Sequence, residues 1–373
     1  MRREHPSPAP VLSPASRPAG RAGADDATAV AHPNIALVKY WGKRDERLVL
    51  PVTSSLSMTL DILPTTTRVR LVAGAGRDEA TLNGVSATGE THRRITAFLQ
   101  LVRERAGDGR RAVVDSTNTV PTGAGLASSA SGFAALAVAA AAAYGLDPGT
   151  TALSRLARRG SGSASRSLFG GFAVWHAGHD TATGTVTGTG TGTAEEAEAE
   201  EAADLGSYAE PVPAAAGMDP ALVVAVVDAG PKTVSSREAM RRTVSTSPLY
   251  LPWADSSTRD LADMRTALRA GDLDAVGEIA ERNALGMHAT MLAARPAVRY
   301  LSPATVTVLD TVLGLRREGI GAYATMDAGP NVKILCRRTD APRVAQALRA
   351  GAVRGSVLVA GPGPGARLLG GER

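Results

Sequence analysis

A glycine- and serine-rich segment, residues 121–132, leads without a break into an alanine-rich run that is expected to be helical. Its Gly123 and Gly125 permit a tight turn and a close approach of the backbone to a ligand. A helix that starts after such a turn presents free N–H groups to an anion, and Ser128 and Ser129 add hydroxyl donors there. The segment therefore predicts a phosphate-binding loop, and a plain glycine-rich turn before a core helix is the alternative. Because no Lys precedes the Ser as in a Walker A motif, the cations must come from elsewhere.

Cationic side chains that could neutralise a phosphate occur in two other segments. Lys39, Tyr40 and Lys43 lie within five residues of one another. The second segment, 232–237, combines a Lys and two Ser with Arg237. Ammonium and guanidinium groups bind phosphate oxygens, and hydroxyl groups donate to them. The alternatives are a solvated strand end for the first segment and a polar loop for the second.

Two further segments could handle a carboxylate and a hydroxyl of a substrate. Ser161, Ser163 and Arg166 lie in a small-residue turn, where an arginine fork can bind a carboxylate with two hydrogen bonds. Asp327 begins the turn Asp-Ala-Gly-Pro-Asn at 327–331, and a carboxylate at a strand end can orient or deprotonate a hydroxyl. The alternatives are a helix cap with a surface Arg for the first segment and a plain hairpin for the second. The sequence shows no His, Cys or carboxylate cluster with metal-ligand spacing.

Hydrophobic periodicity predicts the elements that must position these residues. The expected strands cover 48–60, 67–72, 111–114, 172–175, 222–227, 322–326, 332–336 and 356–360. The expected helices cover 91–105, 133–144, 151–159, 257–268, 272–292, 303–317 and 341–350. Gly145 is expected just past the end of its helix, Ser257 with Asp260 is expected to cap one helix and Asp272 the next, and His288 is expected to be a packing residue. Strands and helices mixed in both halves predict an α+β fold.

Composition narrows the class of protein. The chain has 373 residues, long enough for two domains or one two-lobed unit. Its 41 Lys and Arg against 36 Asp and Glu are spread along the chain, and aromatic residues make up only 3%, which argues against nucleic-acid binding. The single Cys336 excludes an intrachain disulfide and is typical of a reducing cytoplasm. Because no apolar run reaches the roughly 18 residues of a membrane span, no membrane partner is expected.

Two segments have the composition of disordered or inserted chain. Residues 1–29 carry five prolines and lack the apolar core of a secretory signal, so we expect an untargeted, disordered tail. A Thr-Gly repeat at 181–193 and the Glu/Ala-rich stretch after it are expected to form a surface insertion, 177–210.

The order of these motifs resembles the diphosphomevalonate decarboxylase family of the GHMP kinase superfamily. The resemblance runs from about Ala31 to Gly365, apart from the insertion. It rests on the segments 39–45, 121–130, 161–166 with Gly170-Gly171, 235–237 and 326–331. It implies ATP-dependent phosphorylation of a tertiary 3-hydroxyl, loss of the phosphate and decarboxylation to isopentenyl diphosphate.

The resemblance also implies a role for each candidate residue. Asp327 matches the catalytic carboxylate at the 3-hydroxyl, and Arg166 matches the arginine that binds the substrate carboxylate. The implied substrate-binding residues are Ser161, Ser163, Tyr40, Lys43 and Arg237, the last three at the diphosphate. The implied residues on the nucleotide side are Gly123, Gly125, Ser128, Ser129 and Lys39, and Lys39 is also expected to be catalytic. ATP with Mg²⁺ is expected, the ion being carried by the triphosphate without a dedicated protein site.

The family resemblance further implies a two-lobed fold with the active site in the cleft between the lobes, and a cytoplasmic homodimer. The N-terminal lobe is expected to resemble ribosomal protein S5. The expected division is a tail at 1–29, an N-terminal nucleotide-binding lobe at 30–215, a C-terminal lobe at 216–366 and a tail at 367–373.

Three positions depart from the family pattern, and three other functions compete with the one implied. Thr53 stands where the family usually has Asn, Ser165 where many members have Cys, and Gly123 where Ala is usual. The nearest alternatives are a decarboxylase of the monophosphate and a kinase that stops after phosphorylation. Tyr40, Lys43 and Arg237 favour a substrate with a second phosphate. A non-catalytic anion or nucleic-acid binder is the third alternative, and the dispersed charge argues against it.

Overall fold

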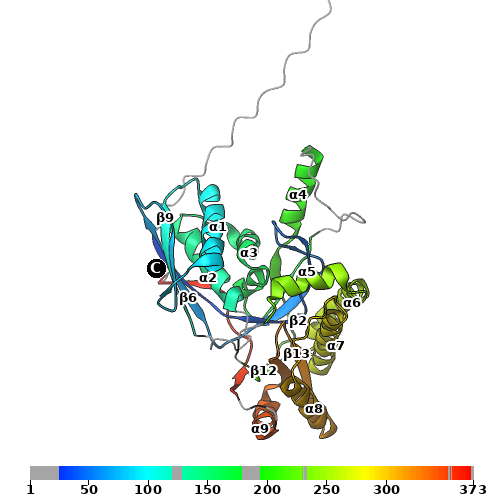
Figure 1. Ribbon diagram of the computed structural model, residues 1–373. Coiled ribbons are helices and arrows are strands. Elements are labelled where there is room, and N and C mark those ends of the chain that lie inside the picture. Colours follow the sequence, from blue (N-terminus) through cyan, green and yellow to red (C-terminus); the bar gives the residue numbers. More distant parts are fainter. Residues whose placement is uncertain are drawn as a thin grey trace, which may run out of the picture.

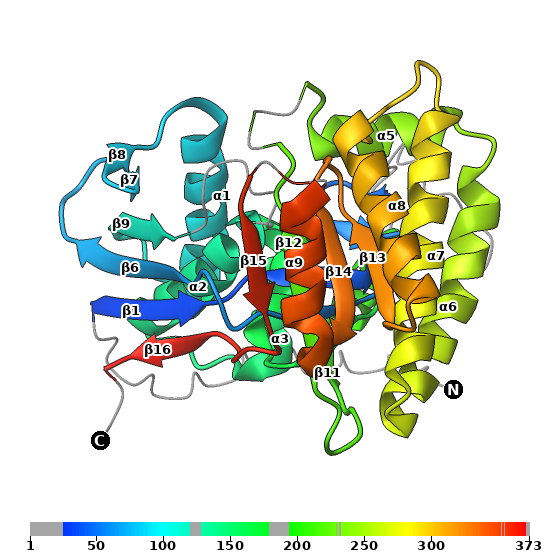
Figure 2. The ribbon, with the colours of Figure 1, turned by 90° about the horizontal axis from the view of Figure 1, so that it is seen from below.

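The computed structural model describes residues 25–119, 128–178, 194–228, 230, 233–351, 353 and 355–370. These residues form two lobes, which lie side by side in Figure 2, with β1, β6 and β9 in one and β12 to β14 in the other. Each lobe combines sheet and helix, which confirms the predicted α+β class. Most of the predicted tail, up to residue 24, and the Thr-Gly repeat lie outside the described residues.

The N-terminal lobe is built on a six-stranded sheet with three helices packed against it. Its strand order is β16 (Arg367–Leu369), β1 (Asp26–Ala31), β6 (Thr65–Val72), β9 (Arg111–Asn118), β7 (Glu79–Leu82) and β8 (Val85–Ser86). The helices are α1 (Gly89–Ala106), α2 (Ser128–Ala143) and α3 (Gly149–Gly160). Alternate residues of β6 are buried, as expected for a sheet with one face covered.

Helix α2 fills the centre of this lobe. It is apolar on all sides, and a helix of that kind is stable only when it is surrounded by other elements. It packs on β1 and β6, and its many alanines bring the helix backbone close to the sheet. The helix that follows the predicted phosphate loop is therefore rigidly held. Past its end, Gly145 has a φ of 70°, in line with the expected left-handed residue.

Two four-stranded sheets complete the scaffold. The first has the order β11 (Ala209–Val212), β10 (Phe172–Trp175), β5 (Ser55–Thr59) and β2 (Asn34–Val38). The second, in the C-terminal lobe, has the order β13 (Ala322–Met326), β14 (Val332–Arg337), β12 (Pro220–Ala225) and β15 (Val357–Ala360). The smaller elements are the hairpin β3 (Lys43–Asp45) and β4 (Leu50–Pro51), the 3-10 helices Gly162–Leu168 and Arg338–Asp340, and α5 (Ser236–Thr246).

The C-terminal sheet is covered on both faces, and one of its cores is shared with the other lobe. Helices α8 (Pro303–Arg317) and α9 (Ala341–Gly351) pack on the face that includes Val223. The opposite face, which includes Val224, packs against α6 (Tyr250–Ala270) and α7 (Leu273–Leu292). The same core contains Ile35 of β2 and Met58 of β5. The first four-stranded sheet and the C-terminal lobe are thus joined by continuous apolar contact.

Most predicted elements appear with ends shifted by a few residues, and two expectations are wrong. The expected strand at 48–60 is interrupted, because a non-strand segment separates β4 from β5. Ser257 does not begin a helix: α6 starts at Tyr250, and Ser257 is a buried residue in its middle. Asp272 does cap the following helix, accepting a hydrogen bond from the amide of Ala275. Helix α5 was not expected; Ser235 caps it by accepting from the amide of Glu238.

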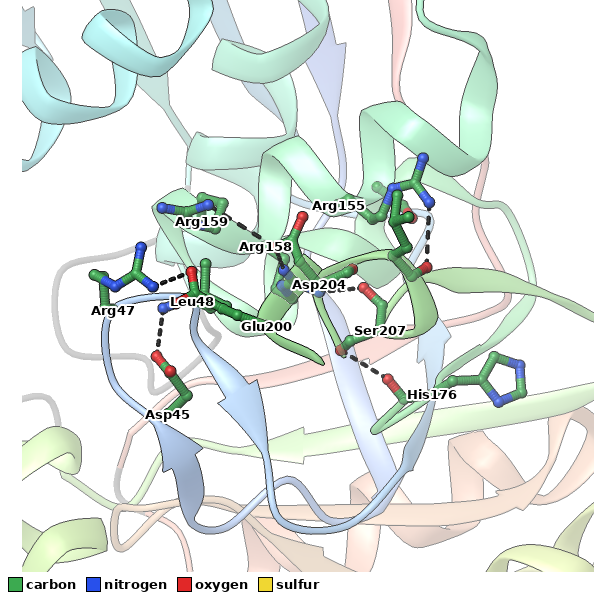
Figure 3. Close-up of polar contacts among 12 residues, drawn as sticks. Asp45, Arg47, Leu48, Arg155, Arg158, Arg159, His176, Glu200, Asp204 and Ser207 are labelled. Atoms are coloured by element: carbon green, nitrogen blue, oxygen red, sulfur yellow. Dashed lines mark hydrogen bonds and ion pairs between the residues drawn. The ribbon is translucent and has the colours of Figure 1, made fainter. Parts of the chain in front are cut away.

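The Glu/Ala-rich part of the expected insertion is a helix fixed to the lobe. Helix α4 (Ala194–Gly206) projects from the molecule in Figure 1, and its C-terminal end is docked on α3 (Figure 3). There the fully buried Arg158 pairs with Asp204 and donates to the carbonyl of Ser207. Glu200 pairs with Arg47 of the β3–β4 hairpin. Strand β11, whose first two residues the expected insertion also contained, is paired with β10 along its whole length.

The expected C-terminal tail also includes structure. Strand β16 pairs with β1, with Ala29 opposite Leu368, so the end of the chain returns to the N-terminal lobe. In Figure 2 the last strand lies beside the first. The expected boundary at residue 366 therefore does not separate the lobe from a tail.

Candidate active site

A cleft of about 1050 Å³ lies between the lobes, and its walls come from both of them. The candidate residues that line it are Lys39, Tyr40, Lys43, Ser129, Ser161, Ser163, Arg166, Arg237 and Asp327. Gly123 and Gly125 lie outside the described residues, and Ser128 is described only as the first residue of α2. Residues spread over 289 positions of the chain, from Lys39 to Asp327, are therefore brought to one cavity.

Asp327 is held between two buried lysines. It follows β13, and one carboxylate oxygen lies 2.8 Å from the Nζ of Lys39 while the other lies 3.3 Å from the Nζ of Lys333. Each lysine is only 1% exposed. Burial opposes ionisation of Asp327, but the two ammonium groups outweigh it and hold the pKa of Asp327 well below its usual range. Asp327 is therefore a carboxylate with both oxygens engaged, a strong hydrogen-bond acceptor and a weak base.

Burial and the ion pair with Asp327 act in opposite directions on the pKa of Lys39. Burial lowers the pKa of Lys39, while the charge of Asp327 raises it. Its Nζ also donates to the carbonyl oxygen of Ala36 at 2.7 Å. Beside this pair, the ring Nε2 of His288 lies 3.2 Å from the backbone carbonyl of Asp327. His288 is 2% exposed, and burial together with the charge of Lys39 lowers its pKa to about 4, so its imidazole is neutral.

Arg166 is a buried cation without a carboxylate partner in the described part of the chain. Its Nε donates to Ser57 Oγ at 2.9 Å, Nη1 donates to Ser55, and Nη2 donates to Asn34 Oδ1 at 3.3 Å. Burial lowers the pKa of Arg166 to about 10, so it remains charged at neutral pH. Neutral partners orient the guanidinium but leave its charge uncompensated, so this wall of the cleft favours an anionic ligand group.

The predicted diphosphate residues form a more open part of the cleft. Tyr40 packs edge-on against the ring of Trp175 with centroids 4.7 Å apart, and its buried hydroxyl has no partner among the described residues. Lys43 pairs with Glu46 of its own hairpin. Arg237 of α5 reaches across the cleft to Glu90 of α1, with Nη1 and Oε1 2.9 Å apart. Both predicted cations are thus present, each paired with an exposed carboxylate.

The serines on the remaining wall connect this site to the predicted phosphate loop. Ser129, in the first turn of α2, lies with its Oγ 3.3 Å from the Oγ of Ser161. The amide of Asn34 donates to the backbone carbonyl of Ser163 at 2.9 Å, which fixes the turn that carries Arg166. Ser165, one of the departures noted above, uses its hydroxyl within this turn, donating to the carbonyl of Gly162 at 2.8 Å.

Several residues of the site were not found from the sequence. Lys333 lies inside a strand whose apolar pattern gives no reason to single it out, and Asn34, Ser55 and Ser57 are ordinary strand residues until Arg166 is placed beside them. The sequence offers one signal for these residues: each is a polar residue at a strand position where the pattern predicts burial. The described residues contain no cluster of three His, Cys, Asp or Glu side chains that could hold a metal ion. Across the same residues, no helix combines the length and apolarity needed to cross a bilayer.

Comparison with known proteins identifies the family of the chain. A family profile described as diphosphomevalonate decarboxylase-like N-terminal domain matches residues 31–186, and one described as mevalonate 5-diphosphate decarboxylase C-terminal domain matches 222–355. The diphosphomevalonate decarboxylase of Aspergillus fumigatus is 37% identical over 344 residues, which cover 87% of this chain and 80% of that protein. The human enzyme is 35% identical over 328 residues, 82% of this chain and 76% of that protein.

Solved structures give the same result for the fold. Mevalonate diphosphate decarboxylase from Staphylococcus aureus superposes with a TM-score of 0.83 at 37% identity, covering 92% of this chain and 98% of that one. A structure described as a complex with MVAPP, AMPPCP and magnesium superposes with a TM-score of 0.82 at 42% identity, with the same coverage.

A two-lobed α+β fold, with a carboxylate between two buried lysines in the cleft and a helix N-terminus on one wall, defines a GHMP-like protein that acts on a small phosphorylated molecule. The resemblance found in the motifs is confirmed. The chain belongs to the diphosphomevalonate decarboxylase family.

Proposed function

We propose that this chain converts diphosphomevalonate and ATP to isopentenyl diphosphate, ADP, phosphate and CO₂ in the mevalonate pathway. The family membership supports the reaction, and the observation that carries its placement is Asp327 between Lys39 and Lys333 at the cleft. The 3-hydroxyl of the substrate donates a hydrogen bond to Asp327, which turns an oxygen lone pair toward the γ-phosphate. With its pKa well below the usual range, Asp327 acts mainly by orientation and charge, and it takes the hydroxyl proton only late, when the forming O–P bond has made that proton acidic.

The remaining steps use the other groups of the cleft. Arg166 binds the substrate carboxylate, and its neutral hydrogen-bond partners keep the guanidinium in place. Phosphorylation turns the hydroxyl into a phosphate leaving group. When phosphate departs, the electron pair of the C–C bond to the carboxylate forms the new double bond and CO₂ is released. Tyr40, Lys43 and Arg237 bind the distal diphosphate, and Ser161 and Ser163 line the substrate wall.

The nucleotide side of the site uses the start of α2. Ser129, with Ser128 and the glycines of the 121–127 segment, binds the phosphates of ATP. Magnesium neutralises charge on the triphosphate during transfer. The ion is held mainly by the phosphates, because Mg²⁺ keeps several waters and takes few ligands from the protein.

One assay tests this function against its alternatives. The protein is incubated with ATP, Mg²⁺ and either mevalonate, its monophosphate or its diphosphate, and ADP and CO₂ are measured together. Equal amounts of ADP and CO₂ from the diphosphate alone are expected. Turnover of the monophosphate, or ADP without CO₂, would instead support the monophosphate decarboxylase or the simple kinase. Retention on DNA without any ATP turnover would support the non-catalytic binder.

We also propose that the protein is a cytoplasmic homodimer, as the family resemblance implies. The single cysteine, buried at 1% exposure, supports a reducing compartment. Light scattering coupled to gel filtration tests the dimer: a mass near twice that of the chain is expected, and the mass of one chain would contradict it. Fractionation of the source cells tests the location.

A further inference from the structure

The backbone of Lys39 is held by a side chain from the other lobe. Strand β2 stops pairing with β5 at Val38, after a register shift, so the amide of Lys39 falls just beyond the ladder. This amide donates to Oδ1 of Asn283 on α7, at 2.8 Å. Asn283 is 1% exposed, so the contact is shielded from water. The residue that carries the ammonium next to Asp327 is therefore anchored at its backbone by a buried amide.

The opposite end of the Asn283 side chain is held as well. Its Nδ2 donates to Asp260 Oδ2 at 2.8 Å and to Ser257 Oγ at 3.0 Å, both on α6. Asp260 is fixed in turn, because its Oδ1 accepts from Arg282 Nε at 2.8 Å. These are Ser257 and Asp260, which the sequence suggested as a helix cap. Inside the helix, they hold Asn283 instead.

Only one orientation of the Asn283 amide fits these partners. If the amide were turned by 180°, its NH₂ group would face the N–H of Lys39 and its oxygen would face the carboxylate of Asp260. Both contacts would then be repulsive. The charge of Asp260 therefore selects the orientation in which the amide oxygen receives the backbone of Lys39.

We propose that Asn283, oriented by Asp260, is a positioning residue that sets Lys39 against Asp327. The inference rests on the proposed function, in which Lys39 and Asp327 serve phosphoryl transfer. A lysine side chain has four flexible methylene groups, so its ammonium is placed accurately only when its backbone and its end are both fixed. Asn283 fixes the backbone and Asp327 the ammonium, at 2.8 Å each. Misplacement by about 1 Å can cost on the order of 100-fold in rate.

The test exchanges the amide of Asn283 and the carboxylate of Asp260 between the two positions. Asn283→Asp keeps size and the acceptor for Lys39 but sets two carboxylates against each other, and we expect kcat to fall about 10–100-fold while both KM values stay within about threefold. The double variant Asn283→Asp with Asp260→Asn reverses the bond between residues 283 and 260, because the new amide at 260 donates to the new carboxylate at 283; the bonds donated by Lys39 and Arg282 keep their direction. We expect it to recover kcat to within about threefold of wild type.

Two controls separate positioning from general loss of stability. Leu268→Ala removes a fully buried side chain elsewhere on α6, so it should lower the melting temperature without lowering kcat below the melting range. Asp263→Asn removes the other, exposed partner of Arg282 and should leave kcat unchanged. If Asn283→Asp does not fold, Asn283→Ala avoids the charge conflict and should show the same fall in kcat.

Each outcome decides the proposal. Loss of kcat in the folded single variant with recovery in the double variant supports it. A folded single variant with wild-type kcat, or a folded double variant as slow as the single one, overturns it while the proposed function stands. If the wild-type protein releases no CO₂ from diphosphomevalonate, the proposed function itself is wrong, and this is established before any variant is measured.

Discussion

The two ends of the cleft hold their charges in opposite ways. At the Asp327 end, both lysines are 1% exposed, and the Asp327 side chain between them is 30% exposed, to the cleft. At the diphosphate end, Arg237 and Glu90 are 46% and 67% exposed, and Glu46 is 56% exposed. Ion pairs exposed to water are weak and are screened by salt, whereas removing one member of a buried group leaves an uncompensated charge.

This difference suits the buried end to positioning the reacting groups and the exposed end to binding the substrate. At the buried end, separating Asp327 from its lysines costs much free energy, so the reacting groups are held in one geometry. At the exposed end, a carboxylate can leave its cation at little cost when a diphosphate arrives. Glu46 and Glu90 thus pair with the two cations that, in the proposed function, bind the phosphates of the substrate. Mutations at the two ends should therefore differ in size, in the kinetic constant affected and in salt dependence.

The largest effect is expected for Asp327→Asn. The variant keeps shape but loses the charge that orients the hydroxyl, so kcat should fall about 10²–10⁴-fold and ADP and CO₂ should fall together. Stability should also decrease, because two buried ammonium groups lose their partner. Adding Lys333→Met restores the wild-type net charge of the group and should recover the melting temperature but not kcat. If Asp327→Asn formed ADP at nearly the wild-type rate, Asp327 would have no catalytic role and would only form the turn of a hairpin.

Arg237→Gln should affect binding. We expect the KM for diphosphomevalonate to rise about tenfold. This is the low end of the range for a charged hydrogen bond, because Arg237 is half exposed. The preference of the enzyme for the diphosphate over the monophosphate should also become smaller. The difference from wild type should shrink at high salt. Arg241→Gln, an exposed position of the same helix, is the matched control. An unchanged preference between the two substrates would remove Arg237 from the diphosphate site.

The buried end should also be sensitive to acid through His288. Its pKa is lowered to about 4 in the folded protein, whereas an unfolded histidine titrates near 6.5. Below pH 6.5 the unfolded chain therefore binds a proton that the folded chain does not, and stability falls as the pH drops toward 4. The loss attributable to His288 is roughly 2 kcal/mol between pH 7 and pH 5. Urea unfolding at both pH values should show this loss reduced in His288→Gln; an identical pH dependence in the variant contradicts it.

The smallest effect is expected for Glu90→Gln. Because the exposed pair with Arg237 is worth at most about 1 kcal/mol, releasing Arg237 should lower the KM for diphosphomevalonate about two- to fivefold at low salt. Glu104→Gln, on the same helix, should leave the KM unchanged. A higher KM in Glu90→Gln would show that Glu90 assists binding and does not compete with the substrate.

The sequence predicted the motifs of the site better than the contacts that hold them. Lys39, Arg166 and Asp327 lie in short segments of distinctive composition, so residue type and order were enough to propose them. Asn283 carries no such signal, because its role depends on contact with a residue 244 positions away. Ser257 and Asp260 illustrate the same limit: their spacing is that of a helix cap, and only the tertiary structure reveals that they lie inside α6 and bind Asn283. The roles of the motif residues themselves stay predictions.

The pairing of β16 with β1 has a consequence for how the protein is made. Strand β1 is synthesised long before Arg367–Leu369, the strand that completes its outer edge. At 5–20 residues per second, translation leaves that edge open for about 20–70 s. An unpaired strand edge is a template for aggregation. The edge of β1 is therefore exposed during synthesis, and a truncation that removes Arg367–Leu369 would leave it exposed in the finished protein.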